Sequence, residues 1–216
     1  MAEPEVYYNP EQETKKDFSI KKTELFQILI AWVGITFAFS WKGVGGISSM
    51  LIMLPIIFAG TLTGFICHEL AHKFTAIHYN ARAQFVMWPM GLVFAIVMSL
   101  VTSGGFVFAA LGAVYIWGKN ISRKENGIIS FSGPLANFCF ALVAIIIGFI
   151  LKFTIGSGYL MLLCFGVAQI NLFLGLFNLL PIPPLDGFKV FLWNKLIWII
   201  SLLVFIGTYI LLVVFG

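Results

Sequence analysis

The chain has 216 residues, of which 60% are hydrophobic and only 10% are charged. Soluble domains carry about 25% charged residues, so this composition excludes an ordinary soluble domain and favours a protein with several membrane spans. The formal net charge of +4 does not indicate nucleic-acid binding, because the basic residues are better explained by their positions relative to the spans.

The first 24 residues form a mixed polar segment without apolar periodicity. No cleavable signal peptide is evident, since the first apolar run begins only at Leu25. We expect 1–24 to be a surface tail on the cytoplasmic side and 25–216 to form a single membrane domain.

Apolar runs long enough to cross a bilayer follow the tail. A helical span needs roughly 20 such residues. The pattern predicts an all-α polytopic fold, with spans at about 25–41, 49–77, 127–151, 159–180 and 196–215.

The stretch 82–118 is ambiguous, because it is apolar but broken by Pro89 and several glycines. Its second half is rich in aromatic and β-branched residues, as strands are. It could form two short spans, or a β-hairpin with a helical insert covered by the rest of the protein. We therefore expect five to six transmembrane helices and a membrane-associated β-hairpin or re-entrant region.

The basic residues favour one orientation. If the tail is cytoplasmic and 82–118 makes no net crossing, all of the 13 Lys and Arg residues except Lys42 and Lys152 lie inside. Such a bias is typical of cytoplasmic loops. We expect an integral membrane protein whose N-terminus faces the cytoplasm.

The most informative motif, H-E-L-A-H at 68–72, lies in the second apolar run. His68 and His72 are four residues apart, so both imidazoles lie on one helical face and can bind one metal ion. Glu69 can reach a water molecule at that ion and remove its proton. Ionisable side chains within a span are costly and persist mainly where function or a partner holds them. The motif therefore predicts zinc-dependent hydrolysis inside the bilayer.

A zinc hydrolase generally uses three protein ligands, and Asp186 is the best third candidate. Three prolines within 181–184 cannot continue a regular helix, so the chain must unwind there. This unwinding, with Gly187, allows Asp186 to turn inward. His78 remains an alternative, although it lies six residues after His72 and off that helical face.

The predicted membrane depth of these two segments supports the pairing of Asp186 with His68 and His72. The motif at 68–72 lies in the cytoplasmic third of the second span, and Asp186 follows the cytoplasmic end of the fourth. These depths match only if 82–118 contains an even number of crossings. The distribution of basic residues requires the same condition.

At these residues the chain resembles the site-2 protease family of intramembrane metalloproteases. The matching segments are H-E-L-A-H at 68–72, S-G-P-L-A-N at 132–137 and N-L-L-P-I-P-P-L-D-G at 178–187. The G-F-V-F-A-A segment at 105–110 is similar to a compact archaeal or bacterial branch. The resemblance implies a location in the cell membrane of such an organism and a form without PDZ or CBS domains.

The resemblance implies that His68, His72 and Asp186 bind one zinc ion per chain. It also implies that Glu69 is the general base and that the active site faces the cytoplasm. The expected substrates are transmembrane proteins or leftover signal peptides, and an extended substrate would pair with the edge of the hairpin.

Two asparagines are further candidates by the same resemblance. Asn178 would lie near the zinc and bond the substrate backbone or the developing oxyanion. Asn137 would line the site or help to hold helices together. Interhelical hydrogen bonding is the alternative for both residues.

Two other functions remain open from the sequence. A catalytically inactive, zinc-binding membrane scaffold would keep the ligands, but it would have no need of Glu69. A metal-ion transporter would use the same ligands as a transit site, although its ligands should be spread over several spans. The natural substrate and the oligomeric state cannot be inferred from the chain.

Overall fold

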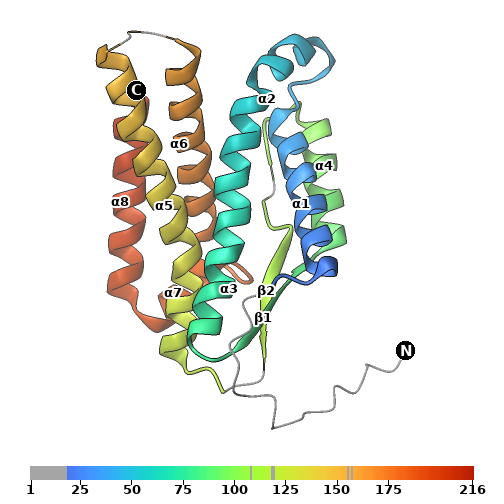
Figure 1. Ribbon diagram of the computed structural model, residues 1–216, viewed down its shortest axis with the longest axis vertical. Helices are drawn as coiled ribbons and strands as arrows, with labels where there is room; N and C mark the ends of the chain where they lie inside the picture. Colours follow the sequence, from blue (N-terminus) through green and yellow to red (C-terminus); the bar gives the residue numbers. More distant parts are fainter. Residues whose placement is uncertain (1–18, 108, 118–119, 155, 157) are drawn as a thin grey trace.

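The computed structural model describes residues 19–107, 109–117, 120–154, 156 and 158–216 (Figure 1). In this part of the chain, five helices are long and apolar enough to cross a membrane. They are α1 (Lys22–Ser40), the continuous helix Ile47–His78, α5 (Arg123–Thr154), α6 (Tyr159–Asn178) and α8 (Lys195–Phe215). The predicted all-α polytopic fold is confirmed, and the span ends agree to within a few residues.

The predicted tail differs from the structure at its end. Helix α1 begins at Lys22, so Glu24 lies in its first turn and is buried. Acidic side chains are favourable at this position because they complement the positive end of the helix dipole. Residues 1–18 of the predicted tail lie outside the described residues.

The second span is a continuous helix with three consecutive segments. Helix α2 (Ile47–Thr61) leads into a π-helical turn, Leu62–Cys67, and then into α3 (His68–His78). π-Helical turns inside α-helices occur frequently at functional sites. Here the turn ends at the residue before His68.

The ambiguous stretch is a β-hairpin with a helical insert. Strand β1 (Arg82–Met87) pairs antiparallel with β2 (Gly112–Trp117), and α4 (Pro89–Val101) lies between them in the sequence. With 13 residues, α4 is shorter than a typical span; it packs against α1 (Figure 1). Because the two ends of this stretch pair with each other, it makes no net crossing. The described residues between α4 and β2 form no second helix, so the alternative of two short helical spans is wrong.

The core consists of two main apolar clusters, one on each side of the second span. One joins α1, the π-helical turn, the hairpin and the return segment after α4. The other joins α5, α6 and α8. The short helix α7 (Asp186–Trp193) packs against α5. This arrangement places the ends of α3 and α6 and the starts of α5 and α7 at the same end of the molecule (Figure 1).

Candidate metal centre

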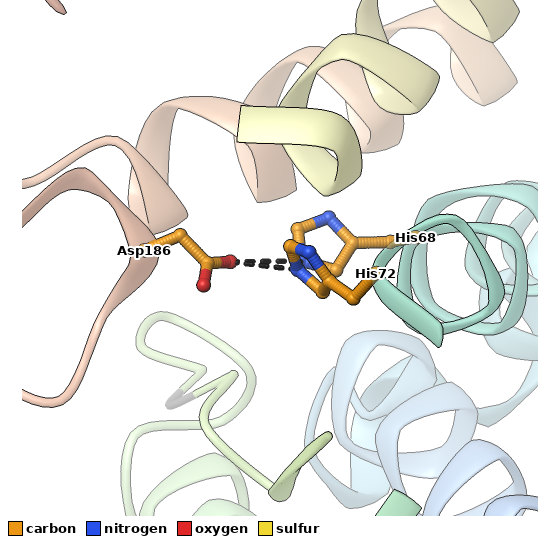
Figure 2. A group of neighbouring side chains, drawn as sticks. All are labelled: His68, His72 and Asp186. Carbon is orange, nitrogen blue, oxygen red and sulfur yellow. Dashed lines mark hydrogen bonds and ion pairs between the residues drawn. The ribbon is translucent and has the colours of Figure 1, made fainter. Parts of the chain in front are cut away.

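The site forms where α3 meets the start of α7. Helix α6 ends at Asn178 and α7 begins at Asp186, so the proline-rich segment between them is not helical. This matches the unwinding expected from three prolines that cannot continue a regular helix. As a result, Asp186 is the first residue of α7 and faces the two histidines of α3 (Figure 2).

The candidate ligand atoms lie close to one another. Nε2 of His68 is 3.0 Å from Nε2 of His72. Oδ2 of Asp186 is 3.2 Å from the first of these nitrogens and 2.9 Å from the second (Figure 2). The two histidines are only 2% and 5% exposed. Three potential ligands from two distant segments therefore converge on one buried point.

The tautomer of His68 is fixed by Asn137, which is fully buried on α5. The amide nitrogen of Asn137 donates to the carbonyl oxygens of Gly64, at 3.1 Å, and of Asn171, at 3.3 Å. Both partners can only accept, so the amide oxygen must point the other way, toward Nδ1 of His68, at 2.9 Å. Nδ1 therefore carries a proton, and Nε2 is the nitrogen that presents a lone pair when the ring is neutral.

His72 has the same tautomer for a similar reason. Its Nδ1 atom lies 2.7 Å from the backbone carbonyl oxygen of Ile129, to which it must donate. Metal-binding histidines commonly donate their other ring N–H to a carbonyl or carboxylate in this way.

The donor set fits a divalent cation. Two imidazole lone pairs and a carboxylate oxygen face one another at about 3 Å, and these groups repel unless a cation or a proton lies between them. Two His and one Asp match the nitrogen and oxygen ligands that zinc uses in hydrolytic sites.

Gly133 leaves room for the imidazole rings of His68 and His72 because it has no side chain. A Cβ atom at this position would lie 2.4 Å from Nε2 of His72 and 2.7 Å from Cε1 of His68. Since Gly133 lies inside α5, its backbone cannot move away easily. The glycine of the S-G-P-L-A-N motif is thus required by the close approach of the histidines.

The charge of Asp186 is stabilised by its neighbours. Burial alone would raise the pKa of Asp186, but the charged form of the His72 and His68 imidazoles, in which a proton takes the place of the cation, lowers it more strongly, to well below its usual range. Lys189, one turn later, places Nζ 3.6 Å from the other carboxylate oxygen. Asp186 is therefore ionised at neutral pH, as a metal ligand must be.

Glu69 lies beside this cluster. One of its carboxylate oxygens has no hydrogen-bond partner within the described part of the chain, although the side chain is buried. Glu69 and both histidines line one cavity of about 80 Å³, which has room for several water molecules. An unpaired buried carboxylate is costly, so its place beside the cluster points to a chemical role.

The remaining predicted residues occupy different positions. Asn178 is half-buried and lines the cavity, and its amide donates to the carbonyl of Leu174 at 3.2 Å. Asn137 does not line the cavity, because its polar atoms are engaged between helices. His78 is exposed at the end of α3 and is not one of the clustered residues.

Sequence reasoning missed Asn171, whose backbone carbonyl helps to orient Asn137. Its own amide nitrogen donates to Oγ1 of Thr63, at 2.8 Å, and to the carbonyl of Val167, at 2.9 Å. The signal was an isolated asparagine in the middle of an apolar run, which usually marks an interhelical partner.

Comparison with known proteins found related metalloproteases. The chain is 40% identical over 190 residues to "putative zinc metalloprotease MJ0611" of Methanocaldococcus jannaschii, covering 88% of this chain and 94% of that protein. It is 27% identical over 154 residues to the similarly named YwhC of Bacillus subtilis, covering 65% and 69%. It is also 27% identical over 188 residues to Rip2 of Mycolicibacterium smegmatis, covering 79% and 70%. Neither a protein-family model nor a solved structure matches the chain.

Proposed function

The chain belongs to the site-2-protease-like family of zinc metalloproteases, and from this premise we propose that it hydrolyses peptide bonds within or next to transmembrane segments of membrane-anchored proteins. The observation that carries the proposal is the position of the His68, His72 and Asp186 cluster. It lies at one end of a bundle of helices that can cross a membrane. A soluble protease would have no need to bury its site among such helices.

One zinc ion would be held by Nε2 of His68, Nε2 of His72 and a carboxylate oxygen of Asp186. When bound there, zinc polarises the scissile carbonyl and lowers the pKa of water toward about 7. Asn137 and the carbonyl of Ile129 accept from the two Nδ1 atoms, so Nε2 is the nitrogen of each ring that is left to bind the ion. The site is therefore preorganised to accept the ion.

Glu69 would act as the general base. Its unpaired carboxylate oxygen shares the cavity with the ligand atoms. It would remove a proton from the attacking water and return it to the leaving amine. A scaffold that only binds zinc has no use for such a group, so this feature favours catalysis.

Asn178 would contact the substrate. It lines the same cavity, and its side chain is only half-buried. An amide N–H in this position can bond the substrate backbone or stabilise the developing oxyanion.

The substrate would bind as an extended segment beside β2. A transmembrane helix hides its peptide bonds in the i→i−4 hydrogen bonds, so it must unwind locally before cleavage. Strand β2 lies at the cavity, which is lined by Ala113, Val114 and Ile116. Its backbone can add a further strand, as in other cases of β-augmentation.

The basic residues support an orientation in which the N-terminus and the active site face the cytoplasm. Lys189, Arg123 and Lys124 lie at the end of the molecule where the cluster is found. Basic residues near span ends are enriched on the cytoplasmic side. We place the protein in the cell membrane of an archaeon or bacterium, with water entering the site from the cytoplasm.

The function is tested with purified protein in lipid vesicles and a single-span test substrate. The wild type should contain one zinc ion per chain and cut the substrate in or next to its span. A chelator should abolish cleavage, and added zinc should restore it. Glu69→Gln should keep zinc but lose cleavage. Undiminished cleavage by Glu69→Gln would refute the mechanism, and zinc flux into sealed vesicles without cleavage would indicate a transporter.

A further inference from the structure

Two charged residues outside the metal centre form a buried ion pair between α1 and α3, the helix that carries His68 and His72. Nζ of Lys73 on α3 lies 2.6 Å from Oε2 of Glu24 on α1, and the side chains are only 3% and 1% exposed. Lys73 immediately follows His72, so their side chains point to different sides of the helix. One side of α3 therefore holds the metal cluster, and another is bound to α1. A buried ion pair is weak evidence for stability in itself, so its other contacts must indicate what it does.

The second oxygen of Glu24 reaches the sheet. Oε1 accepts a hydrogen bond from the backbone N–H of Phe85 at 2.9 Å. One turn later on α1, Oε1 of Gln27 accepts from the backbone N–H of Met87 at 2.8 Å. Alternate N–H groups of a strand point to the same edge. Side chains of α1 therefore occupy the edge of β1 that faces away from β2.

This leaves β2 as the strand that can accept another chain. Within the described residues, β2 pairs only with β1. Val114 lies opposite Phe85 in the ladder and also lines the cavity that contains His72. A continuous series of contacts thus runs from the metal-binding helix, through Lys73, Glu24 and Phe85, to the strand beside the cavity.

We propose that Glu24, together with Lys73 and Gln27, is a positioning residue that sets which peptide bond of a substrate paired with β2 reaches the metal centre. The inference rests on the proposed function, because it needs a substrate that pairs with the outer edge of β2. Adjacent residues of a strand are about 3.3 Å apart. A sheet displaced by that distance along its strands would therefore present a neighbouring bond.

The test maps the cleaved bond of one single-span substrate by mass spectrometry. The double variant Glu24→Leu/Lys73→Met removes both buried charges and also the acceptor for Phe85. It should keep zinc but distribute cleavage over neighbouring bonds. Glu24→Gln/Lys73→Met also removes both charges but keeps an acceptor of the same length for the Phe85 N–H. It should restore cleavage at the wild-type bond, which a merely structural role of the ion pair would not predict.

Gln27→Met is the milder second variant, since it removes only the neutral acceptor for Met87 and should also broaden the cleavage pattern. Ser99→Ala is the matched control, because Ser99 is a buried donor whose hydrogen bond goes to the carbonyl of Ala38 on α1 and not to the sheet. It should cleave only the wild-type bond. If Gln27→Met, and Glu24→Leu/Lys73→Met where it binds zinc, cut only the wild-type bond at the wild-type rate, the inference is wrong. If the wild type cuts no membrane substrate, the proposed function fails and this inference with it.

Discussion

His68 and Asn137, which are 69 residues apart, are joined by a buried 2.9 Å hydrogen bond that fixes the tautomer of the histidine. The amide of Asn137 is held in turn by carbonyls of the second span and of α6. Three helices therefore determine the direction of one lone pair. The candidate metal centre depends on this packing as much as on the candidate ligands themselves.

Replacing Asn137 by leucine should weaken zinc binding. The substitution leaves Nδ1 of His68 without its acceptor, so the ring is free to change tautomer or rotate. Loss of such a partner typically costs roughly 10- to 100-fold in metal affinity. Competition with a chromogenic chelator measures the effect. Wild-type affinity in Asn137→Leu would show that the hydrogen bond does not orient the ligand.

Replacing Asn171 by leucine should affect stability more than zinc binding. Asn137 is bonded to the backbone carbonyl of Asn171, which the substitution retains, whereas the side-chain bond to Thr63 is lost. Interhelical bonds of this kind contribute about 0.6–2 kcal/mol in membranes. Thermal unfolding in detergent and the chelator assay separate the two effects. A larger loss of zinc affinity in Asn171→Leu than in Asn137→Leu would contradict this expectation.

Replacing Asp186 by alanine should remove zinc from the purified protein and abolish proteolysis. The two histidines alone cannot complete a three-ligand site. Metal analysis by mass spectrometry checks the first result. Lys189→Met is the control, because its ion pair with Asp186 is long and half-exposed, and such pairs contribute only about 0–1 kcal/mol. Full zinc occupancy in Asp186→Ala would exclude Asp186 as a ligand.

Replacing Gly133 by alanine should weaken zinc binding, although alanine favours the helix. The new methyl group would lie 2.4 Å from Nε2 of His72 and force the ligands apart. We expect at least a roughly tenfold loss of zinc affinity, similar to the loss of a partner of a ligand.

Gly207→Ala is the matched control for this substitution. Among the residues that the structure describes, no other group lies within 4 Å of a Cβ atom at Gly207 on α8. This variant should bind zinc as the wild type does and be more stable by about 0.5–1 kcal/mol. Equal zinc affinity in both glycine variants would disprove the packing argument.

Much of the fold could be predicted because membranes impose a simple rule. Spans need long apolar runs, so the five helices were visible in the sequence, with ends correct to within a few residues. For residues 82–118 the sequence left two alternatives open, a β-hairpin with a helical insert or two short spans. Choosing between them required the pairing of Arg82 with Trp117, which is a contact between residues distant in the sequence.

The candidate site was accessible for a different reason. His68, Glu69 and His72 follow helical spacing, and Asp186 follows a proline break, so local rules place each of them. Glu24 and Lys73 carry no such local signal. Glu24 was assigned to a surface tail, because nothing near it in the sequence shows that a lysine 49 positions away lies in contact with it.

The separation of the candidate ligands along the chain affects when the enzyme can become active. Asp186 lies 114 residues after His72, so a nascent polypeptide leaves the ribosome with its histidine pair long before the carboxylate has been synthesised. Under this ligand assignment, an unfinished or prematurely terminated product has an incomplete centre. Under the proposed function, membrane proteins inserted nearby at the same time would not be cleaved until Asp186 has been synthesised and has reached the two histidines.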